Sequence, residues 1–270
     1  MGEAFTYRCR MDRFDWRTAT DAEVDHEYSP SRFALRPLPE YFAEYRERST
    51  RRAPGELSIP GRPLLVYIHG GYWQRLSAAD SLFVADDAVA RGVSLHAVEY
   101  TLAPEGTIPG MIAECVADIV ASVDRLGPSR TVVAGCSAGA HLTAMCARDP
   151  EVARRIDGVA LLSGIFDVRP FVRTGDNAAL GLDDASASAV SPQLLDGPVG
   201  LHKAICAVGG HESSEFIRQN AEYAELLRSR GCDTSDAVVS HRDHFDLPYD
   251  LLARGTTVGD WVLDTLEVDR

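Results

Sequence analysis

The residues best suited to catalysis are a serine between glycines and, later in the chain, a carboxylate and a histidine. Gly135-Cys136-Ser137-Ala138-Gly139 matches the pattern G-x-S-x-G, which places a serine on a sharp turn between a strand and a helix. At a helix N-terminus, free N–H groups would stabilise a developing oxyanion. Ser137 is therefore the predicted nucleophile of an acyl transfer. A chance match in a chain rich in Gly and Ala is the alternative.

A second glycine-rich segment, His69-Gly-Gly-Tyr-Trp73, ends the first predicted core strand. Gly70 and Gly71 would let backbone N–H groups approach a substrate oxygen, and Ala138 would supply another N–H next to the serine. We therefore predict an oxyanion hole formed by Gly70, Gly71 and Ala138. The side chains expected to contact substrate are His69, Tyr72, Trp73 and Phe245, with a place in the core as the alternative for the aromatic pair.

The candidate general bases are two histidines that follow the last predicted strand, His241 and His244. A nucleophilic serine needs a histidine that accepts its proton and returns it to the leaving group. We favour His244, which lies deeper in the loop and precedes Phe245. His241 is closer to the strand and is expected to have a structural role.

The predicted acid of the triad is Glu212, in the segment Gly209 to Phe216 after the preceding strand. A carboxylate here would orient the histidine and stabilise its charged form. The alternative for Glu212 is a helix N-terminal carboxylate, favourable on dipole grounds alone. Asp167 and Asp243 are rival acids.

Alternation of short apolar runs with helical patterns predicts the fold. We expect strands over residues 63–69, 93–99, 131–135, 158–162, 204–208 and 237–240, and helices over 38–52, 80–91, 108–126, 138–147, 213–230 and 247–266. This order indicates an α/β fold, a mostly parallel sheet flanked by helices. We interpret residues 1–270 as one domain, with an N-terminal cap segment over 1–60 and a lid-like insertion over 166–200.

Composition excludes several function classes. The net charge of −13 argues against nucleic acid and anionic membranes as partners. The single lysine, Lys203, leaves no Walker A loop. The six cysteines form no CxxC pair and no Cys/His cluster with zinc spacing. Acyl transfer to Ser137 implies no metal or cofactor. With no apolar signal segment and no run of roughly 18 apolar residues, we expect a cytoplasmic protein.

With these motifs the chain resembles the α/β-hydrolase superfamily over about residues 60–265, and more narrowly its arylformamidase (kynurenine formamidase) branch. The segments similar to that branch are His69–Trp73, Tyr100–Pro104, Ser137–His141, Gly210–Phe216, His244–Phe245 and, near the N-terminus, Tyr28–Ser31. The resemblance implies hydrolysis of N-formyl-L-kynurenine to kynurenine and formate, without a cofactor. Asp is the commoner acid in such enzymes, so Glu212 is a variation.

Other functions fit the same residues. One is a small-acyl esterase or amidase, and another is an acyltransferase or cyclase that acts on a biosynthetic intermediate. A binding protein on an inactive hydrolase scaffold is a third, although both Ser137 and His244 are present. For each of the enzymes the partner is a small aryl amide or ester. The oligomeric state, with a homodimer among the alternatives, stays open.

Overall fold

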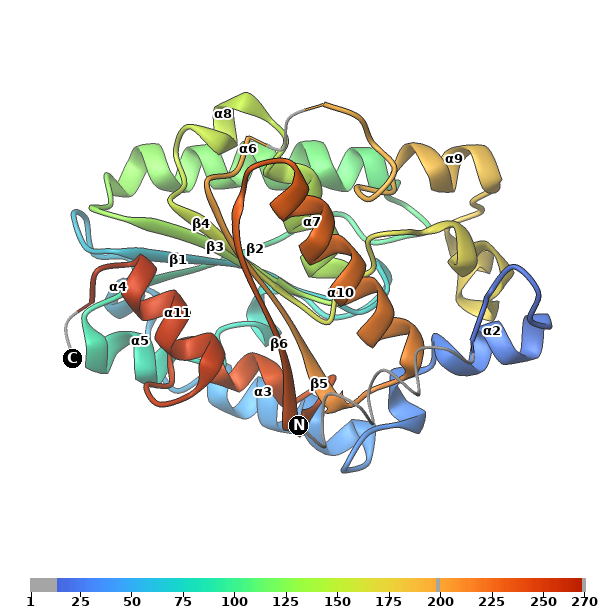
Figure 1. The fold of residues 1–270 in the computed structure, drawn as a ribbon. Helices are drawn as coiled ribbons and strands as arrows, with labels where there is room; N and C mark the ends of the chain where they lie inside the picture. Colours follow the sequence, from blue (N-terminus) through green and yellow to red (C-terminus); the bar gives the residue numbers. More distant parts are fainter. Residues whose placement is uncertain (1–13, 198–199, 269–270) are drawn as a thin grey trace, which may run out of the picture.

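The computed structural model describes residues 14–197 and 200–268, which fold around a six-stranded parallel sheet (Figure 1). The strand order is β2-β1-β3-β4-β5-β6, and every neighbouring pair is parallel. The strands are β1 (Leu64–Ile68), β2 (Ser94–Val98), β3 (Thr131–Cys136), β4 (Gly158–Leu162), β5 (Lys203–His211) and β6 (Asp233–Asp243). The predicted α/β fold with a parallel sheet is confirmed.

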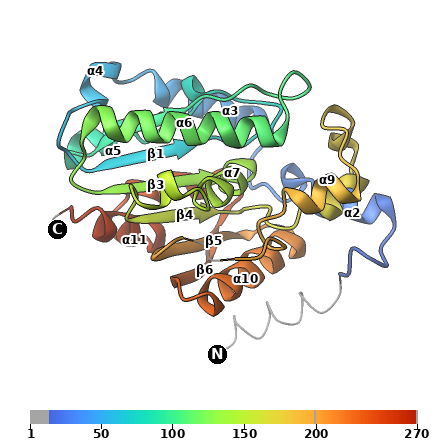
Figure 2. The same cartoon turned by 90° about the horizontal axis from the view of Figure 1, so that it is seen from above.

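Helices cover both faces of the sheet (Figure 2). The α-helices are α2 (Asp21–Glu27), α3 (Leu38–Ser49), α4 (Pro54–Leu57), α5 (Ala85–Arg91), α6 (Ile108–Leu126), α7 (Ala138–Cys146), α8 (Pro150–Ala153), α9 (Asp184–Ala189), α10 (Ser214–Ser229) and α11 (Thr257–Thr265). Short 3-10 helices are η1 (Pro30–Arg32), η2 (Ala78–Asp80), η3 (Arg169–Arg173), η4 (Gly175–Ala179) and η5 (Leu247–Leu252).

The central strands are buried on both faces because each face carries its own apolar layer. All five residues of β1 are buried, as expected for a strand of a parallel sheet between helices. Leu64, Val66 and Ile68 pack with residues of α6, α7 and α10. Leu65 and Tyr67 point to the other face and pack with residues of α5 and α11. This alternation explains why the sequence of β1 is a continuous apolar run.

Several predicted boundaries differ from the structure, and three of the differences have a clear physical reason. The helix predicted over 80–91 begins only at Ala85, because Asp80 ends the separate turn η2, where it accepts a hydrogen bond from Ser77. The last strand is longer than 237–240, since its polar first half pairs with β5 at the exposed edge of the sheet. The predicted C-terminal helix is divided into η5 and α11 by a turn that contains Gly255 at φ +84°.

Two segments outside the sheet lie against each other. Within the predicted lid-like region, η3, η4 and α9 form short helical turns, and η3 contacts both α9 and the N-terminal helix α2. Arg173 of η3 donates hydrogen bonds to the carbonyl groups of Trp16 and Ala19. Residues 1–13 of the predicted N-terminal cap segment and residues 198–199 of the lid-like region lie outside the described residues.

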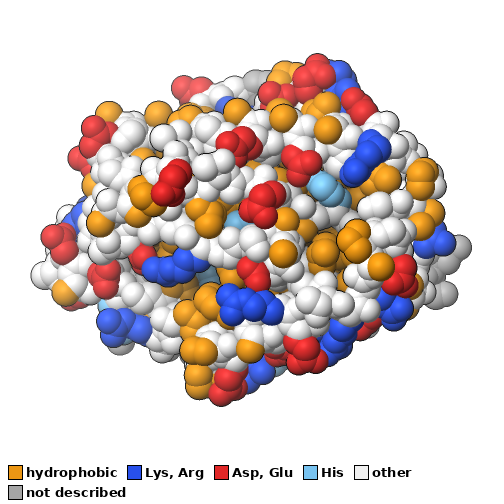
Figure 3. Space-filling model, turned by 180° about the vertical axis from the view of Figure 1, so that it is seen from behind, with side chains coloured by type: hydrophobic (Ala, Val, Ile, Leu, Met, Phe, Trp, Pro, Cys, Tyr) orange, Lys and Arg blue, Asp and Glu red, His pale blue; other side chains and the backbone are white. Residues whose placement is uncertain are grey.

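The surface mixes charges of both signs. On the face seen in Figure 3, acidic and basic side chains are interspersed and do not gather into one basic patch. Across residues 14–197 and 200–268, no helix has the length and apolar character needed to span a membrane.

Candidate active site

The candidate site lies at the carboxyl ends of the parallel strands, where open α/β sheets bind ligands. Ser137 follows β3 directly and precedes α7, with a backbone at φ 58° and ψ −123°. This conformation with positive φ is costly for a residue with a side chain and is found mainly at functional sites. The turn therefore matches the strand-turn-helix context that G-x-S-x-G requires.

The glycines around Ser137 are needed because backbones pass very close there. A Cβ atom on Gly135 would lie 2.3 Å from the carbonyl oxygen of Gly139. A Cβ atom on Gly139 would lie 2.0 Å from the carbonyl oxygen of Ile68, at the end of β1. A Cβ atom on Gly70 would lie 2.8 Å from the carbonyl oxygen of Cys136. These contacts hold the Ser137 turn and the His69–Trp73 loop together.

His244 and Glu212 form a buried pair. His244 Nδ1 lies 2.7 Å from Glu212 Oε2, and both residues are at most 4% exposed. Glu212 Oε1 accepts hydrogen bonds from Ser163 Oγ at 2.6 Å and from the Gly209 N–H at 2.7 Å. Since an ionised carboxylate only accepts hydrogen bonds, Nδ1 of His244 carries the proton and Nε2 is left as an acceptor.

The rival residues make other contacts. Asp167 pairs with Arg169 at 2.8 Å, and its amide N–H donates to Gln219. Asp243 is the last residue of β6 and directly precedes His244, but its carboxylate accepts hydrogen bonds from the N–H groups of Leu35, Phe245 and Asp246 and from the Tyr41 hydroxyl. His241 is exposed. Of the three carboxylates considered, only Glu212 contacts His244.

Asp243 instead fastens the N-terminal segment to the histidine loop. Burial opposes ionisation of this carboxylate, but the hydrogen bonds from Tyr41 and from three backbone N–H groups hold its pKa below the ordinary value. The Cys136 thiol also contacts this loop, with its Sγ 3.6 Å from the carbonyl oxygen of His244. Burial raises the pKa of that thiol, so Cys136 stays neutral.

The predicted oxyanion loop has an unusual backbone. Gly71 has φ +97°, and Tyr72, Trp73 and Leu76 also have positive φ values, between 53° and 69°. A Cβ atom on Gly71 would lie 2.3 Å from the carbonyl oxygen of Arg75. As the first residue of α7, Ala138 has an N–H without a partner inside the helix. Gly70, Gly71 and Ser137 all border one pocket.

Two of the predicted substrate-contacting side chains lie away from the pocket. Trp73 is fully buried, and its Nε1 donates to Nδ1 of the buried His141 at 3.3 Å. The alternative of a core position therefore applies to Trp73. His69 is 1% exposed and stacks on Tyr100, with ring centroids 4.2 Å apart, behind the loop. Tyr72 and Phe245 do line the pocket.

Two other histidines are accounted for by packing and pairing. Burial lowers the pKa of His141 to about 4, and its Nε2 contacts the Val190 carbonyl oxygen at 2.7 Å. His141 is therefore neutral near pH 7. His96, for which the sequence offered no partner, contacts Asp118 at 2.9 Å.

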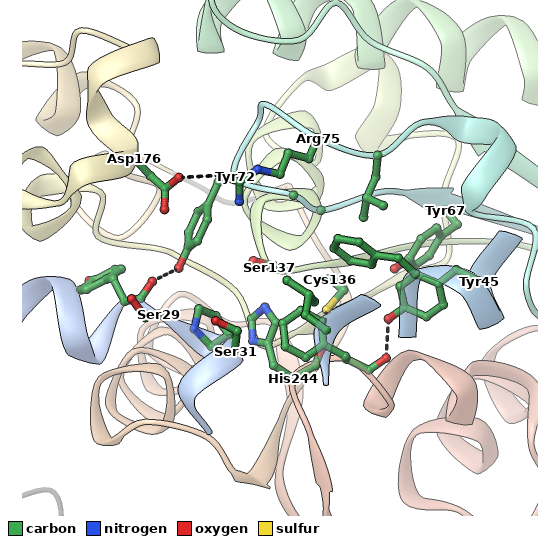
Figure 4. Close-up of a pocket in the computed structure, with 18 residues that line it drawn as sticks. Ser29, Ser31, Tyr45, Tyr67, Tyr72, Arg75, Cys136, Ser137, Asp176 and His244 are labelled. Carbon is green, nitrogen blue, oxygen red and sulfur yellow. Dashed lines mark hydrogen bonds and ion pairs between the residues drawn. The ribbon is translucent and has the colours of Figure 1, made fainter. Parts of the chain in front are cut away.

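The pocket has a cavity volume of about 130 Å³ and two chemically different sides (Figure 4). Figure 4 shows Ser137 and His244 in the middle, Tyr45 and Tyr67 on one side, and Asp176 and Ser29 on the other. The lining residues are Tyr28, Ser29, Pro30, Ser31, Leu38, Phe42, Tyr45, Tyr67, Gly70, Gly71, Tyr72, Arg75, Leu76, Cys136, Ser137, Asp176, His244 and Phe245.

The N-terminal segment forms much of this wall, which the sequence patterns did not predict. Tyr28 to Ser31, Leu38, Phe42 and Tyr45 all border the pocket. The segment is held by buried polar contacts, in which the Tyr72 hydroxyl donates to the Tyr28 carbonyl and the Tyr28 hydroxyl donates to Glu215. The predicted cap segment over 1–60 and the similarity of Tyr28–Ser31 to the arylformamidase branch pointed to this region, but neither assigned its side chains to the pocket.

A metal centre would need several ligating side chains close together. Within the part of the chain that the structure describes, no group of three or more His, Cys, Asp or Glu side chains is arranged to hold a metal ion.

This fold agrees with the sequence comparisons. The model of a family with the α/β-hydrolase fold matches residues 65–245. The chain therefore belongs to the α/β-hydrolase fold family, and it is a hydrolase enzyme.

Within that family the chain is similar to kynurenine formamidases. It is 32% identical to the kynurenine formamidase of Danio rerio, over 86% of this chain and 92% of that protein. The kynurenine formamidase of Drosophila melanogaster is 29% identical over 75% of this chain and 70% of that protein. The chain is thus a kynurenine formamidase-like hydrolase.

Solved structures share the fold. A protein from Silicibacter sp. tm1040 superposes with a TM-score of 0.77 at 24% identity, covering 89% of this chain and 98% of that one. The carboxylesterase EstE1 from a metagenomic library gives a TM-score of 0.68 at 14% identity, covering 94% of this chain and 99% of that one. At these identities the likeness concerns the fold alone.

Proposed function

We propose that this hydrolase cleaves N-formyl-L-kynurenine to L-kynurenine and formate through a Ser137-His244-Glu212 triad. Similarity to kynurenine formamidases over most of both chains supports the substrate. The observation that carries the mechanism is the 2.7 Å contact between His244 and Glu212, in a pocket that His244 shares with Ser137.

In the first half-reaction, Ser137 Oγ forms a bond to the formyl carbon while His244 Nε2 accepts the hydroxyl proton. The carbonyl oxygen becomes an oxyanion, which the N–H groups of Gly71 and Ala138 would stabilise, with Gly70 shaping the loop. The C–N bond then breaks, and His244 returns the proton to the departing aryl amine. L-kynurenine leaves, and a formyl ester remains on Ser137.

In the second half-reaction, water adds to the formyl ester and His244 accepts one of its protons. The ester bond breaks, Ser137 regains its proton from His244, and formic acid leaves and loses its remaining proton to water as formate. Glu212 accepts the hydrogen bond from Nδ1 and stabilises the charged imidazole.

The test is formation of kynurenine, followed by its absorbance, with N-formyl-L-kynurenine as substrate. We expect turnover by the wild-type protein, and a loss of about 10⁴-fold or more in Ser137→Ala. Turnover no higher than that of Ser137→Ala would refute the proposal.

Ester hydrolysis in parallel identifies the alternative chemistry. With p-nitrophenyl acetate, an esterase would show strong turnover that depends on Ser137 but would leave the formamide intact. That result would support the proposed triad but not the formamide substrate, and the substrate would then be another small acyl compound. Turnover of the formamide well above that of the ester supports the formamidase proposal.

A further inference from the structure

Two side chains of opposite charge border the candidate pocket beside the reacting groups. Among the described residues of its lining, Arg75 is the only arginine or lysine and Asp176 is the only aspartate or glutamate. Arg75 Nη2 lies 3.1 Å from Asp176 Oδ1, and the two side chains are 55% and 31% exposed. Figure 4 shows both residues above Ser137. Both line the pocket that Ser137 borders, and both remain partly exposed to solvent.

The pair keeps unused hydrogen-bonding capacity. Its contact joins one guanidinium nitrogen to one carboxylate oxygen. Among the described residues, no other hydrogen bond is made by the Arg75 guanidinium or to the Asp176 carboxylate. Arg has five N–H donors in a fork that matches a carboxylate, whereas Asp accepts from an ammonium group. Both side chains can therefore bind a ligand while they remain near each other.

The ion pair between Arg75 and Asp176 is not needed to hold the two loops together, because the Gln74 side chain already bridges them. The Gln74 side-chain amide donates to the carbonyl oxygen of Tyr72 at 3.2 Å and to that of Asp176 at 2.9 Å. This neutral bridge fastens the oxyanion loop to η4 without using either charge. The Arg75 backbone is in turn packed against Gly71, so the guanidinium is carried on the same rigid loop as the predicted oxyanion N–H group.

We propose that Arg75 and Asp176 form a subsite for a zwitterionic α-amino acid group, with Arg75 binding the carboxylate and Asp176 binding the ammonium. This inference rests on the proposed function and deepens it, since the amine product would carry both charges. A charge of −13 on the protein disfavours approach of a carboxylate, and Arg75 offsets that repulsion locally. The substrate class is then an N-acyl aryl amine with an amino acid end.

The experiment compares two formamides that differ only at that end. N-formyl-L-kynurenine carries the amino acid group, and N-formyl-2-aminoacetophenone lacks it. The readout is the ratio of kcat/KM for these two substrates. We expect Arg75→Gln to lower this ratio by about 10- to 100-fold, mainly through KM, and Asp176→Asn to lower it by about tenfold.

Two control variants separate recognition from other effects. Arg46→Gln removes an exposed arginine that also forms a 3.1 Å ion pair, with Asp80, outside the pocket, and it should leave the ratio unchanged. Gln74→Ala loosens the loop and should lower kcat/KM for both substrates alike. If Arg75→Gln lowers kcat/KM equally for both formamides, or for neither, the proposed subsite is wrong.

Binding of L-kynurenine to Ser137→Ala, measured by calorimetry, tests the subsite independently of formamide turnover. When Arg75→Gln is added to the Ser137→Ala variant, we expect the affinity for L-kynurenine to fall about 10- to 100-fold more than the affinity for 2-aminoacetophenone. If the wild-type protein does not cleave the formamide but this difference is found, the subsite stands and the proposed function fails. Equal losses for both ligands overturn the subsite whatever the turnover.

Discussion

Replacing Glu212 by glutamine tests the proposed triad most directly, because the surroundings dictate how the new amide must lie. In the wild-type protein, Oε1 accepts two hydrogen bonds, from Ser163 and from the Gly209 N–H, and Oε2 faces His244 Nδ1. In the Glu212→Gln variant, the amide oxygen must stay with the two donors. The amide NH₂ group then points at Nδ1, which must give up its proton to accept. The proton moves to Nε2, where it prevents His244 from acting as a base.

The size of the effect follows from the charge that is lost. With about 4 Å between the centres of two unit charges and an effective dielectric constant of about 20, the carboxylate stabilises the imidazolium by about 4 kcal/mol. That corresponds to about 10³-fold in rate. The unfavourable tautomer adds to this, and the corresponding change in another serine hydrolase family costs about 10⁴-fold. We therefore expect kcat to fall by about 10³- to 10⁴-fold.

The assay is steady-state hydrolysis of N-formyl-L-kynurenine by wild type, Glu212→Gln and the matched variant Asp167→Asn. Asp167 pairs with Arg169 and not with His244, so its amide should retain activity within about tenfold. Thermal unfolding of each variant verifies that the fold is intact. The reasoning would be refuted if kcat of a folded Glu212→Gln variant fell by less than about tenfold. It would also be refuted if Asp167→Asn lost more activity than Glu212→Gln.

Three further changes test other parts of the site. Gly71→Ala should reduce kcat by about 10²-fold or more because its Cβ would collide with the Arg75 carbonyl, whereas Gly92→Ala, also at positive φ but with open space, should cost stability only. Asp243→Asn should lower the free energy of unfolding by about 2 kcal/mol at neutral pH. Because the folded pKa of Asp243 is depressed, this contribution is complete above the ordinary pKa of about 4 and is lost below it, so urea unfolding of wild type and variant should converge in acid. His141 has a folded pKa of about 4 and an unfolded pKa of about 6.5, so the unfolded state binds its proton first and stability falls by about 3 kcal/mol as the pH decreases between these values. His141→Gln should remove that slope, and an unchanged slope would contradict it.

The features that could be predicted from the sequence are local in the chain. The strand, turn and helix around Ser137 occupy one continuous stretch, and the glycines that permit it are neighbours of the serine. The same holds for the loop that follows β1. The apolar runs of the buried strands are visible because a parallel sheet covered on both faces selects apolar residues at every position. Polar β6 at the sheet edge lacks that pattern, which is why its length was underestimated.

The features that sequence patterns could not predict depend on contacts between distant segments. Three carboxylates stood at comparable places after strands or beside the histidine, and only the packing of β5 against β6 brings one of them to His244. Gly209 is part of that packing, since a Cβ atom there would lie 2.6 Å from the Arg242 carbonyl oxygen. From the sequence, Trp73 could have faced either the pocket or the core. In the structure it lies in the core, where its Nε1 donates a hydrogen bond to His141 of α7.

The sequence by itself indicated the candidate reacting groups and the succession of strands and helices along the chain, because turn glycines and apolar periodicity are short-range requirements of the backbone. Only the tertiary structure decided what surrounds Ser137. The N-terminal segment joins the pocket through Asp243, which is 208 residues from Leu35 along the chain. The Arg75–Asp176 pair likewise joins residues 101 positions apart. Such contacts are selected by the folded arrangement as a whole, and no local pattern encodes them.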